Sequence, residues 1–330
     1  MIRLSRCLLA VLFVAGLNLA RAAESSPLLR LERTIPLDGV TGRIDHLALD
    51  GAGGRLFVAA YGNRSLEVVD VRAGRRLASL RGLAAPQGVA YDPQTRRVFV
   101  TCAGDATCRI YDAASTLTLS KIAAFPSDPD SVRLTHEAIY VGYGGNGIRV
   151  LDPKTGEMRV DYLLPGHAEA FEVGLDTIYV NVPEAREVTQ IMLGASTAFT
   201  HWSLGGLQAN FPMALDDRSH RLYVGTRRPA MLAVFDTLTG MVIARAPIGG
   251  DVDDLYFDSA HQRLYAVCGA GSVTILQKKV KEDQYMRVGD VVTAPGARTG
   301  LFAPASDTLY VAAPAREGHP AAILVYHAAQ

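Results

Sequence analysis

Short apolar segments separated by polar turns recur along the whole chain, and one pattern returns at a regular interval. Its core is an aliphatic residue, an aromatic residue and then Val or Ala, as in Arg55–Val58 and Arg221–Val224. The aromatic residues of the seven copies lie 42, 41, 39, 44, 42 and 45 residues apart, at Phe57, Phe99, Tyr140, Tyr179, Tyr223, Tyr265 and Tyr310. A period near 42 predicts one repeated supersecondary unit rather than several unrelated domains.

Each copy has the same internal order of apolar, aromatic and more polar segments. An apolar segment such as Val89–Tyr91 comes first, the aromatic segment follows, and a Gly-rich tip leads into a third segment. That third segment often ends in Asp, with Gly four residues later, as after Asp70, Asp152 and Asp236. Four short β segments per unit predict an all-β fold, a seven-bladed β-propeller with four-stranded antiparallel blades.

The last unit lacks a fourth strand of its own, and the chain supplies a candidate at its beginning. Leu29–Ile35 has strand character and no partner near it in the sequence. We expect it to pair with Ala322–Tyr326 and to complete the last blade. An N-terminal strand in the last blade closes the ring and removes the exposed sheet edges.

The beginning of the chain has the pattern of a secretory signal peptide. Arg3 and Arg6 precede an apolar run over 8–19, and small residues follow at Ala20 and Ala22. The run is shorter than the roughly 20 residues that a spanning helix needs. We therefore expect a signal peptide over 1–23, a propeller over 24–330, and a periplasmic or secreted protein with no membrane span in its mature chain.

Composition and cysteine spacing exclude several classes of protein. Lys plus Arg equals Asp plus Glu at 33 each, whereas a nucleic-acid partner favours a basic excess. No CxxCH motif or Walker pattern is present, and Trp202 is the only Trp, so we expect no haem, no nucleotide and no Trp-rich PQQ site. Cys102 and Cys108 flank a hairpin tip. With a three-residue loop the two cysteines would stand directly opposite each other, where a disulfide is possible. With a two-residue loop Cys102 would instead pair with Thr107, and the cysteines would be out of register.

The repeated Tyr-Val strands, the Asp-x-x-x-Gly turns and the signal peptide together resemble the YVTN-repeat, YncE-like family of exported seven-bladed propellers. The resemblance covers essentially the whole mature chain. It implies the fold and the exported location, but it implies no particular ligand or activity. Blade four departs from the pattern, because Gln190–Leu193 lacks the terminal Asp, and blade six carries a polar insertion over 278–283.

Polar residues recur at the position where each innermost strand begins, twelve residues before the repeated aromatic, allowing one-residue gaps. Six of the seven are polar and four are acidic: Asp45, Gln87, Asp130, Glu169, Phe211, Asp253 and Arg298. Further candidates flank this series: Arg43, His46, His167, Asn210, Asp251, Asp254 and Thr299. In a propeller these positions converge on one end of the axial channel. Burying so many carboxylates is unfavourable unless a metal ion, the arginines or water offsets their charge.

The first function that this ring suggests is binding. The proposed site, at the mouth of the axial channel, is composed of Arg43, Asp45, His46, Gln87, Asp130, Glu169, Asn210, Asp253, Asp254 and Arg298. It would take a small polar ligand, with Arg298 pairing to a carboxylate or phosphate. An exported protein is the other possible partner, held by arginines of the rim: Arg64, Arg186, Arg227, Arg228 and Arg316. We expect the chain to be a monomer.

The alternative is a metal-dependent hydrolase or lyase similar in type to the gluconolactonase-like propellers. By that analogy Glu169, Asn210 and Asp253 would hold a divalent ion. Oxygen ligands favour Ca, Mg or Mn, while His46 leaves Zn open. His46 or Asp45 would then be the general base. The sequence does not settle whether the protein is an enzyme.

Overall fold

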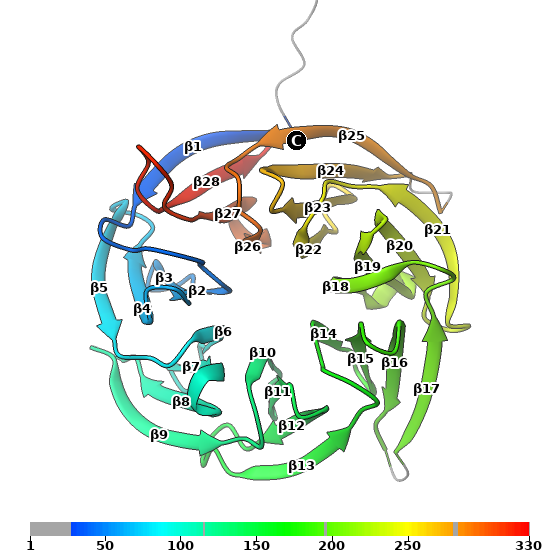
Figure 1. Ribbon diagram of the computed structural model, residues 1–330, viewed down its shortest axis with the longest axis horizontal. Coiled ribbons are helices and arrows are strands. Elements are labelled where there is room, and N and C mark those ends of the chain that lie inside the picture. Colours follow the sequence, from blue (N-terminus) through cyan, green and yellow to red (C-terminus); the bar gives the residue numbers. More distant parts are fainter. Residues whose placement is uncertain (1–27, 115, 195–196, 280–282, 330) are drawn as a thin grey trace, which may run out of the picture.

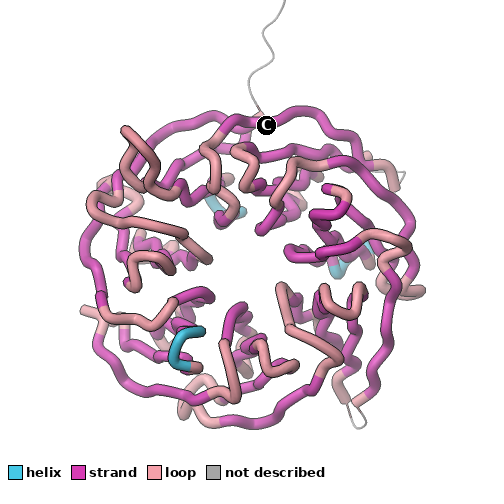
Figure 2. The backbone as a smooth tube through the Cα atoms, viewed as in Figure 1, coloured by secondary structure: helices cyan, strands magenta, loops and turns pink. Residues whose placement is uncertain are grey.

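The computed structural model describes residues 28–114, 116–194, 197–279 and 283–329. Seven four-stranded antiparallel sheets surround a central axis, as the sequence period predicts (Figure 1). In the described part of the chain the only helices are three single 3₁₀ turns, which Figure 2 shows in cyan. No helix among these residues is long and apolar enough to span a membrane. The expected signal peptide, 1–23, lies outside the described residues.

The first three blades follow one another along the chain, each running outward from its innermost strand. Blade one contains β2 (Leu47–Asp50), β3 (Arg55–Ala60), β4 (Ser65–Asp70) and β5 (Arg75–Arg81). Blade two contains β6 (Pro86–Asp92), β7 (Arg97–Cys102), β8 (Thr107–Asp112) and β9 (Thr118–Ala124). Blade three contains β10 (Pro129–Leu134), β11 (Ile139–Tyr143), β12 (Gly147–Leu151) and β13 (Met158–Leu163).

The next three blades repeat this order. Blade four contains β14 (Phe171–Val173), β15 (Thr177–Val182), β16 (Glu187–Met192) and β17 (Ala198–Ser203). Blade five contains β18 (Gln208–Asp216), β19 (Arg221–Arg228), β20 (Ala230–Asp236) and β21 (Met241–Pro247). Blade six contains β22 (Val252–Asp258), β23 (Arg263–Cys268), β24 (Ser272–Lys278) and β25 (Tyr285–Val292).

The seventh blade joins the two ends of the described chain. It contains β26 (Thr299–Ala303), β27 (Thr308–Ala313), β28 (Ala322–Ala328) and β1 (Leu29–Pro36). Strand β1 pairs antiparallel with β28, with Ile35 opposite Ile323. The predicted closure by an N-terminal strand is therefore confirmed, and in Figure 1 the blue β1 lies alongside the red β28.

The repeated aromatic residue packs one blade against the next. Phe57 of blade one contacts Tyr91 of blade two, with ring centroids 5.6 Å apart, and Tyr223 contacts Phe257 of blade six at 5.1 Å. The second strands are buried over nearly their whole length because a neighbouring blade covers each face. Fourth strands such as β21 alternate between exposed and covered positions because one face meets solvent.

The Asp-x-x-x-Gly turns adopt one geometry. The Oδ1 of Asp70 accepts hydrogen bonds from the backbone amides of Arg72 and Ala73 at 2.9 and 2.8 Å. The amide of Gly74 donates to the carbonyl of Asp70 at 2.9 Å, and Gly74 has a φ of +68°, which favours glycine. Asp152 and Asp236 make the same turn, which explains why the sequence repeats it.

The possible Cys102–Cys108 disulfide is not formed, and both residues are free and buried. Cys102 stands opposite Thr107, and Thr101 stands opposite Cys108, so the connection is the four residues 103–106 and not the two or three expected. Opposed residues share a face of the sheet, so this one-residue offset places the two cysteines on opposite faces. Burial raises the pKa of Cys102 to about 11 and that of Cys108 to about 12, so both side chains are thiols packed as small apolar groups.

Candidate functional site

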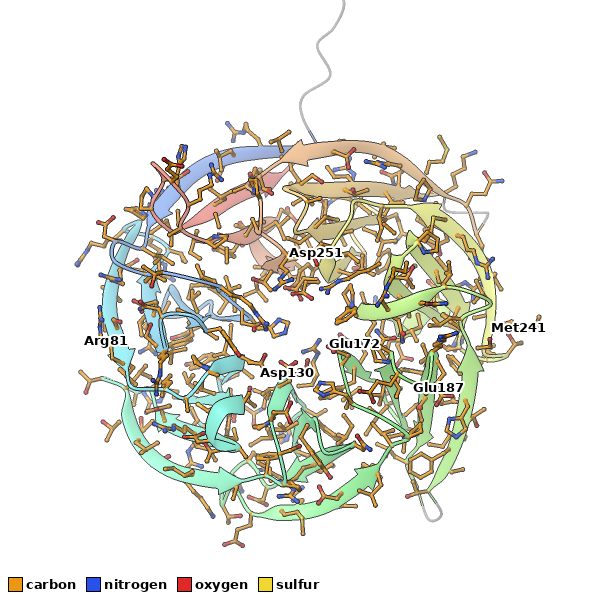
Figure 3. All side chains as sticks on the ribbon, in the orientation of Figure 1. Arg81, Asp130, Glu172, Glu187, Met241 and Asp251 are labelled. Carbon is orange, nitrogen blue, oxygen red and sulfur yellow. The ribbon has the colours of Figure 1, made fainter. Side chains whose placement is uncertain are left out.

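The seven residues aligned at the starts of the innermost strands surround one cavity of about 230 Å³ at the end of the axial channel. In Figure 3 the labelled Asp130 and Asp251 lie beside the central opening. Each position lies at or close to the start of its innermost strand, where strands from all seven blades approach the axis. The cavity is lined by Arg43, Asp45, His46, Gln87, Asp128, Asp130, Ser131, His167, Glu169, Ala170, Phe211, Arg227, Asp253 and Arg298.

On one side of the mouth, carboxylates and arginines from blades five, six and seven pair with one another. Arg227 forms a salt bridge with Asp253 and lies 3.4 Å from Asp251. Arg298 reaches Asp253 at 3.2 Å and Asp251 at 3.3 Å. Burial raises the pKa of Asp253 to about 6, although both arginines oppose the rise. Two arginines thus share two aspartates, so the charges of this group are already matched.

Arg227 is held in place by three different kinds of contact. Its guanidinium lies 3.8 Å from the ring centroid of Phe211, its Nε donates to the carbonyl of Val252 at 2.9 Å, and it pairs with Asp253. A stacked, hydrogen-bonded and paired guanidinium is fixed in orientation. Phe211, the one apolar member of the aligned series, therefore has a role as the platform for this arginine.

Arg43 of the segment before blade one continues this paired group. It forms a salt bridge with Asp45, donates to Gln87 at 3.0 Å and lies over the ring of Tyr61 at 4.6 Å. Blades five, six, seven and one thus contribute one continuous set of matched charges, which we call the ion-paired side: Arg43, Asp45, Arg227, Asp251, Asp253 and Arg298.

His46 lies between two carboxylates. Its Nε2 is 3.7 Å from Asp45 and its Nδ1 is 3.6 Å from Asp254. Burial by itself would lower the pKa of His46, but Asp254, Asp45 and Asp130 outweigh it and raise the pKa to about 10. An imidazolium at neutral pH does not accept a proton, so the geometry argues against His46 as the general base. The oxygens of Asp45 face Arg43 and His46, so Asp45 is no better suited to that role.

Blades three and four present carboxylates that form no salt bridge with an arginine or lysine of the described residues, although His46 and Arg227 lie near enough to act on them. We call Asp130, His167 and Glu169 the open cluster; one ligand atom from each lies within 4.8 Å of the others. The Nε2 of His167 is 4.0 Å from Glu169. Among the described residues, neither that atom nor the Oδ1 of Asp130 has a hydrogen-bond partner, although both are buried. Burial, reinforced by the neighbouring carboxylates Asp45 and Asp253 respectively, raises the pKa of Asp130 and of Glu169 to about 7.

A second cavity of about 440 Å³ continues the channel below the mouth. His46 and Ala170 line both cavities, so the two adjoin. Its walls are the innermost strands, and its charged pairs are Arg133 with Glu172, 3.3 Å apart, and His46 with Asp254, 3.6 Å apart. Figure 3 shows Glu172 beside the central opening. The mouth is therefore polar, and the channel beneath it is mostly apolar with two charged pairs.

The structure does not assemble the predicted metal ligands Glu169, Asn210 and Asp253. Asn210 is fully buried and does not line the mouth. Its Nδ2 donates to the Oδ1 of Asn181 at 2.8 Å and to the carbonyl of Glu187 at 2.9 Å. Neighbouring residues of a strand point to opposite faces, so Phe211 reaches the channel and Asn210 does not.

The remaining predicted residues are placed as follows. Gln87 lines the mouth beside Arg43. Asp254 lines the second cavity and accepts a hydrogen bond from the amide of Gly300 at 2.8 Å. Arg298, expected to bind a ligand carboxylate or phosphate, is already paired with Asp251 and Asp253. Thr299 is buried and donates to the carbonyl of Ile44.

Sequence reasoning missed the position of Arg227, which was expected at the outer rim and instead reaches the mouth. A signal existed. Four residues after the repeated aromatic, five repeats have Ala, Gly or Pro, whereas the other two have Tyr61 and Arg227. Both large residues take part in the guanidinium contacts of the mouth. His167 was recognised only as a flanking residue, and its proximity to Asp130 and Glu169 depends on how two blades meet.

Comparison with known proteins supports the fold. No family model matches the chain, and no curated protein matches it. Among solved structures, the WD40 repeats of RRP9 align over 89% of this chain and 96% of that chain, with a TM-score of 0.77 and 11% identity. Hydrazine synthase of Kuenenia stuttgartiensis aligns over 86% and 95%, with a TM-score of 0.71 and 16% identity. Because 1633 solved chains match, the likeness shows a widely used fold and no single function.

Proposed function

We propose that this chain is an exported propeller of the YVTN-repeat, YncE-like kind, and that the mouth of its axial channel binds a small polar ligand carrying a positive charge. The observation that supports this role is the unequal charge pairing around the mouth. The arginines of the ion-paired side already have carboxylate partners. Among the described residues, Asp130 of the open cluster has no salt-bridge partner, and Glu169 has only His167 at 4.0 Å.

The sign of the ligand follows from this distribution. Partly buried carboxylates that lack an arginine or lysine partner are unfavourable, so a cation placed among them gains their attraction and relieves their repulsion. An anion would have to compete with Asp251 and Asp253 for Arg227 and Arg298. The ligand expected at the open cluster is therefore a molecule with an ammonium group or several hydrogen-bond donors, or a metal ion. A molecule with a free carboxylate or phosphate is not expected there.

Ligand binding is favoured over the hydrolase alternative by two features of the mouth. Asn210 is turned away from it, and His46 is held as an imidazolium between Asp45 and Asp254. The recessed cavity also favours a small ligand over a flat protein surface, because small-molecule sites are concave and carry a few convergent polar groups.

Thermal unfolding of the mature protein in EDTA tests the proposed function. Small amines, neutral sugars, carboxylates and phosphate are added in separate experiments. Binding to the folded state raises the melting temperature, so we expect the amines to raise it. Glu169→Gln should lose the shift and Asp251→Asn, on the ion-paired side, should keep it. Stabilisation by anions alone, or by none of these classes, would contradict the proposal.

The proposed export has its own test. The intact mass of the protein recovered from the periplasm or the medium should correspond to a chain that begins near Ala23, after cleavage near Ala22. A full-length mass, or recovery only from the cytoplasm, would contradict it.

A further inference from the structure

We infer that the open cluster is a binding site for a divalent transition-metal ion, with Asp130, His167 and Glu169 as its ligands. This inference rests on the proposed binding role of the mouth and specifies what the positive charge is. It differs from the set expected by analogy with gluconolactonase-like propellers, since it uses a histidine and replaces Asn210 and Asp253 by Asp130 and His167.

The open cluster supplies a mixed set of oxygen and nitrogen donors. Two carboxylate oxygens and one imidazole nitrogen lie within 4.8 Å of one another, and they come from neighbouring blades. Bonds of about 2.0–2.2 Å to Zn²⁺ need donors somewhat closer than this, which a small inward movement of the side chains provides. Three protein ligands leave a further position open towards the cavity.

Two polar atoms without a hydrogen-bond partner also indicate a ligand, independently of the acidic character of the mouth. The Oδ1 of Asp130 and the Nε2 of His167 each expose less than 1 Å² and have no hydrogen-bond partner among the described residues. Buried polar atoms are nearly always paired, and each exception needs an explanation. Both residues line the same cavity, and a shared cation satisfies both atoms at once.

The backbone of each ligand is held by residues outside the cluster. The hydroxyl of Thr101 donates to the carbonyl of Asp130 at 2.6 Å and accepts from the amide of Gly88 at 2.7 Å. A Cβ at Gly88 would lie 2.0 Å from that carbonyl, so only glycine permits this close approach.

The other two ligands are held in a similar way. The amide of His167 donates to the carboxylate of Glu184 at 3.1 Å, and the amide of Glu169 donates to the carbonyl of Asn181 at 3.1 Å. Metal sites depend on such supporting contacts to orient their ligands. The three side chains therefore start from fixed backbone positions.

The nitrogen donor decides the class of metal. Ca²⁺ and Mg²⁺ prefer sites made of oxygen alone, whereas imidazole favours Zn²⁺, Co²⁺ and Ni²⁺. Zn²⁺ is therefore the suitable probe, and Ca²⁺ distinguishes a real site from general attraction to acidic groups.

Titration calorimetry of the EDTA-stripped mature protein with Zn²⁺ tests the inference, with circular dichroism as a check that each variant is folded. We expect one Zn²⁺ per chain and much weaker binding of Ca²⁺. His167→Gln and Asp130→Asn should weaken Zn²⁺ by more than the roughly 10- to 100-fold that losing a supporting contact costs. Thr101→Val, which removes one such contact, should fall within that range.

The matched control is His201→Gln in the same blade. The Nδ1 of His201 lies 2.6 Å from Glu187 on the outer strands β16 and β17, so this is also a His–Glu pair, but it is not part of the open cluster. Its Zn²⁺ affinity should equal that of the wild type. Absence of Zn²⁺ binding, equal affinity for Ca²⁺, or equal effects of His167→Gln and His201→Gln would overturn the inference. If amines bind at the mouth while Zn²⁺ does not, the metal site is refuted and the proposed function stands.

Discussion

Both sides of the channel mouth present carboxylates, but these carboxylates have different partners. On the ion-paired side, Arg227 and Arg298 share Asp251 and Asp253, so the acidic groups stabilise the arginines and are stabilised by them. In the open cluster, the only salt-bridge contact among the described residues joins Glu169 to His167, at 4.0 Å. A ring of acidic residues is therefore not one uniform site. One side is held together by ion pairs, and the other is where we propose that a cation binds.

Among the residues of the mouth, Arg227 should give the largest loss of stability when it is replaced. Arg227→Ala leaves Asp253 partly buried with only Arg298, and it removes the stacking on Phe211. Removing one partner of a buried ion pair is strongly destabilising, so we expect the free energy of unfolding to fall by about 3 kcal/mol. Urea denaturation at pH 7 measures the loss. A decrease below about 1 kcal/mol, the size expected for an exposed pair, would show that the ion-paired side is not structural.

His46 gives the next largest effect, and the size of this effect depends on pH. Its pKa is about 10 when folded and near 6.5 when unfolded. Its stabilisation is therefore fully present below pH 6.5 and is lost as the pH rises through 10. His46→Gln should lower the free energy of unfolding by about 2 kcal/mol at pH 6, and the difference should shrink towards pH 10. A deficit that is independent of pH would mean that packing, rather than charge, accounts for the role of His46.

Asp130 should respond in the opposite direction. Its folded pKa of about 7 lies above the ordinary 3.8, so its contribution to stability is present below pH 4 and is lost as the pH rises through 7. Asp130→Asn should therefore raise the free energy of unfolding of the EDTA-treated protein by about 1 kcal/mol at pH 8, with little change at pH 4. Denaturation at both pH values measures this, and a destabilised variant at pH 8 would refute the unpaired character of the open cluster.

The smallest effect is expected at Arg298, and it distinguishes this arginine from Arg227 on the ion-paired side. Arg298→Ala still leaves Asp253 paired with Arg227, so the loss in the free energy of unfolding should be about 0.5 kcal/mol. The same urea titration compares it with Arg227→Ala. Equal losses would mean that Arg227 has no special position, in spite of its contacts with Phe211 and Val252.

The fold and the location of the mouth could be predicted because both follow from the repeat. A period near 42 fixes the number of blades, and equivalent positions in a closed ring must converge on the axis. The closing strand Leu29–Pro36 was also predictable, since an unpaired edge needs a partner.

The pairing within the mouth could not be read from the sequence. Arg227 meets Asp253 across a blade boundary, and a one-residue shift of register decides whether Phe211 or Asn210 faces the channel. The same kind of offset separates Cys102 from Cys108. Periodicity predicts which residues lie near one another. The geometry of each strand decides which of their side chains are in contact.

Native mass spectrometry of the protein, purified without chelators, tests directly whether the open cluster holds a cation. The wild type, Asp130→Asn of the open cluster and Asp251→Asn of the ion-paired side are compared. A bound metal or small cation should be present on the wild type and on Asp251→Asn and absent from Asp130→Asn. The same bound mass on Asp130→Asn, or no bound mass on any of the three, would contradict the account.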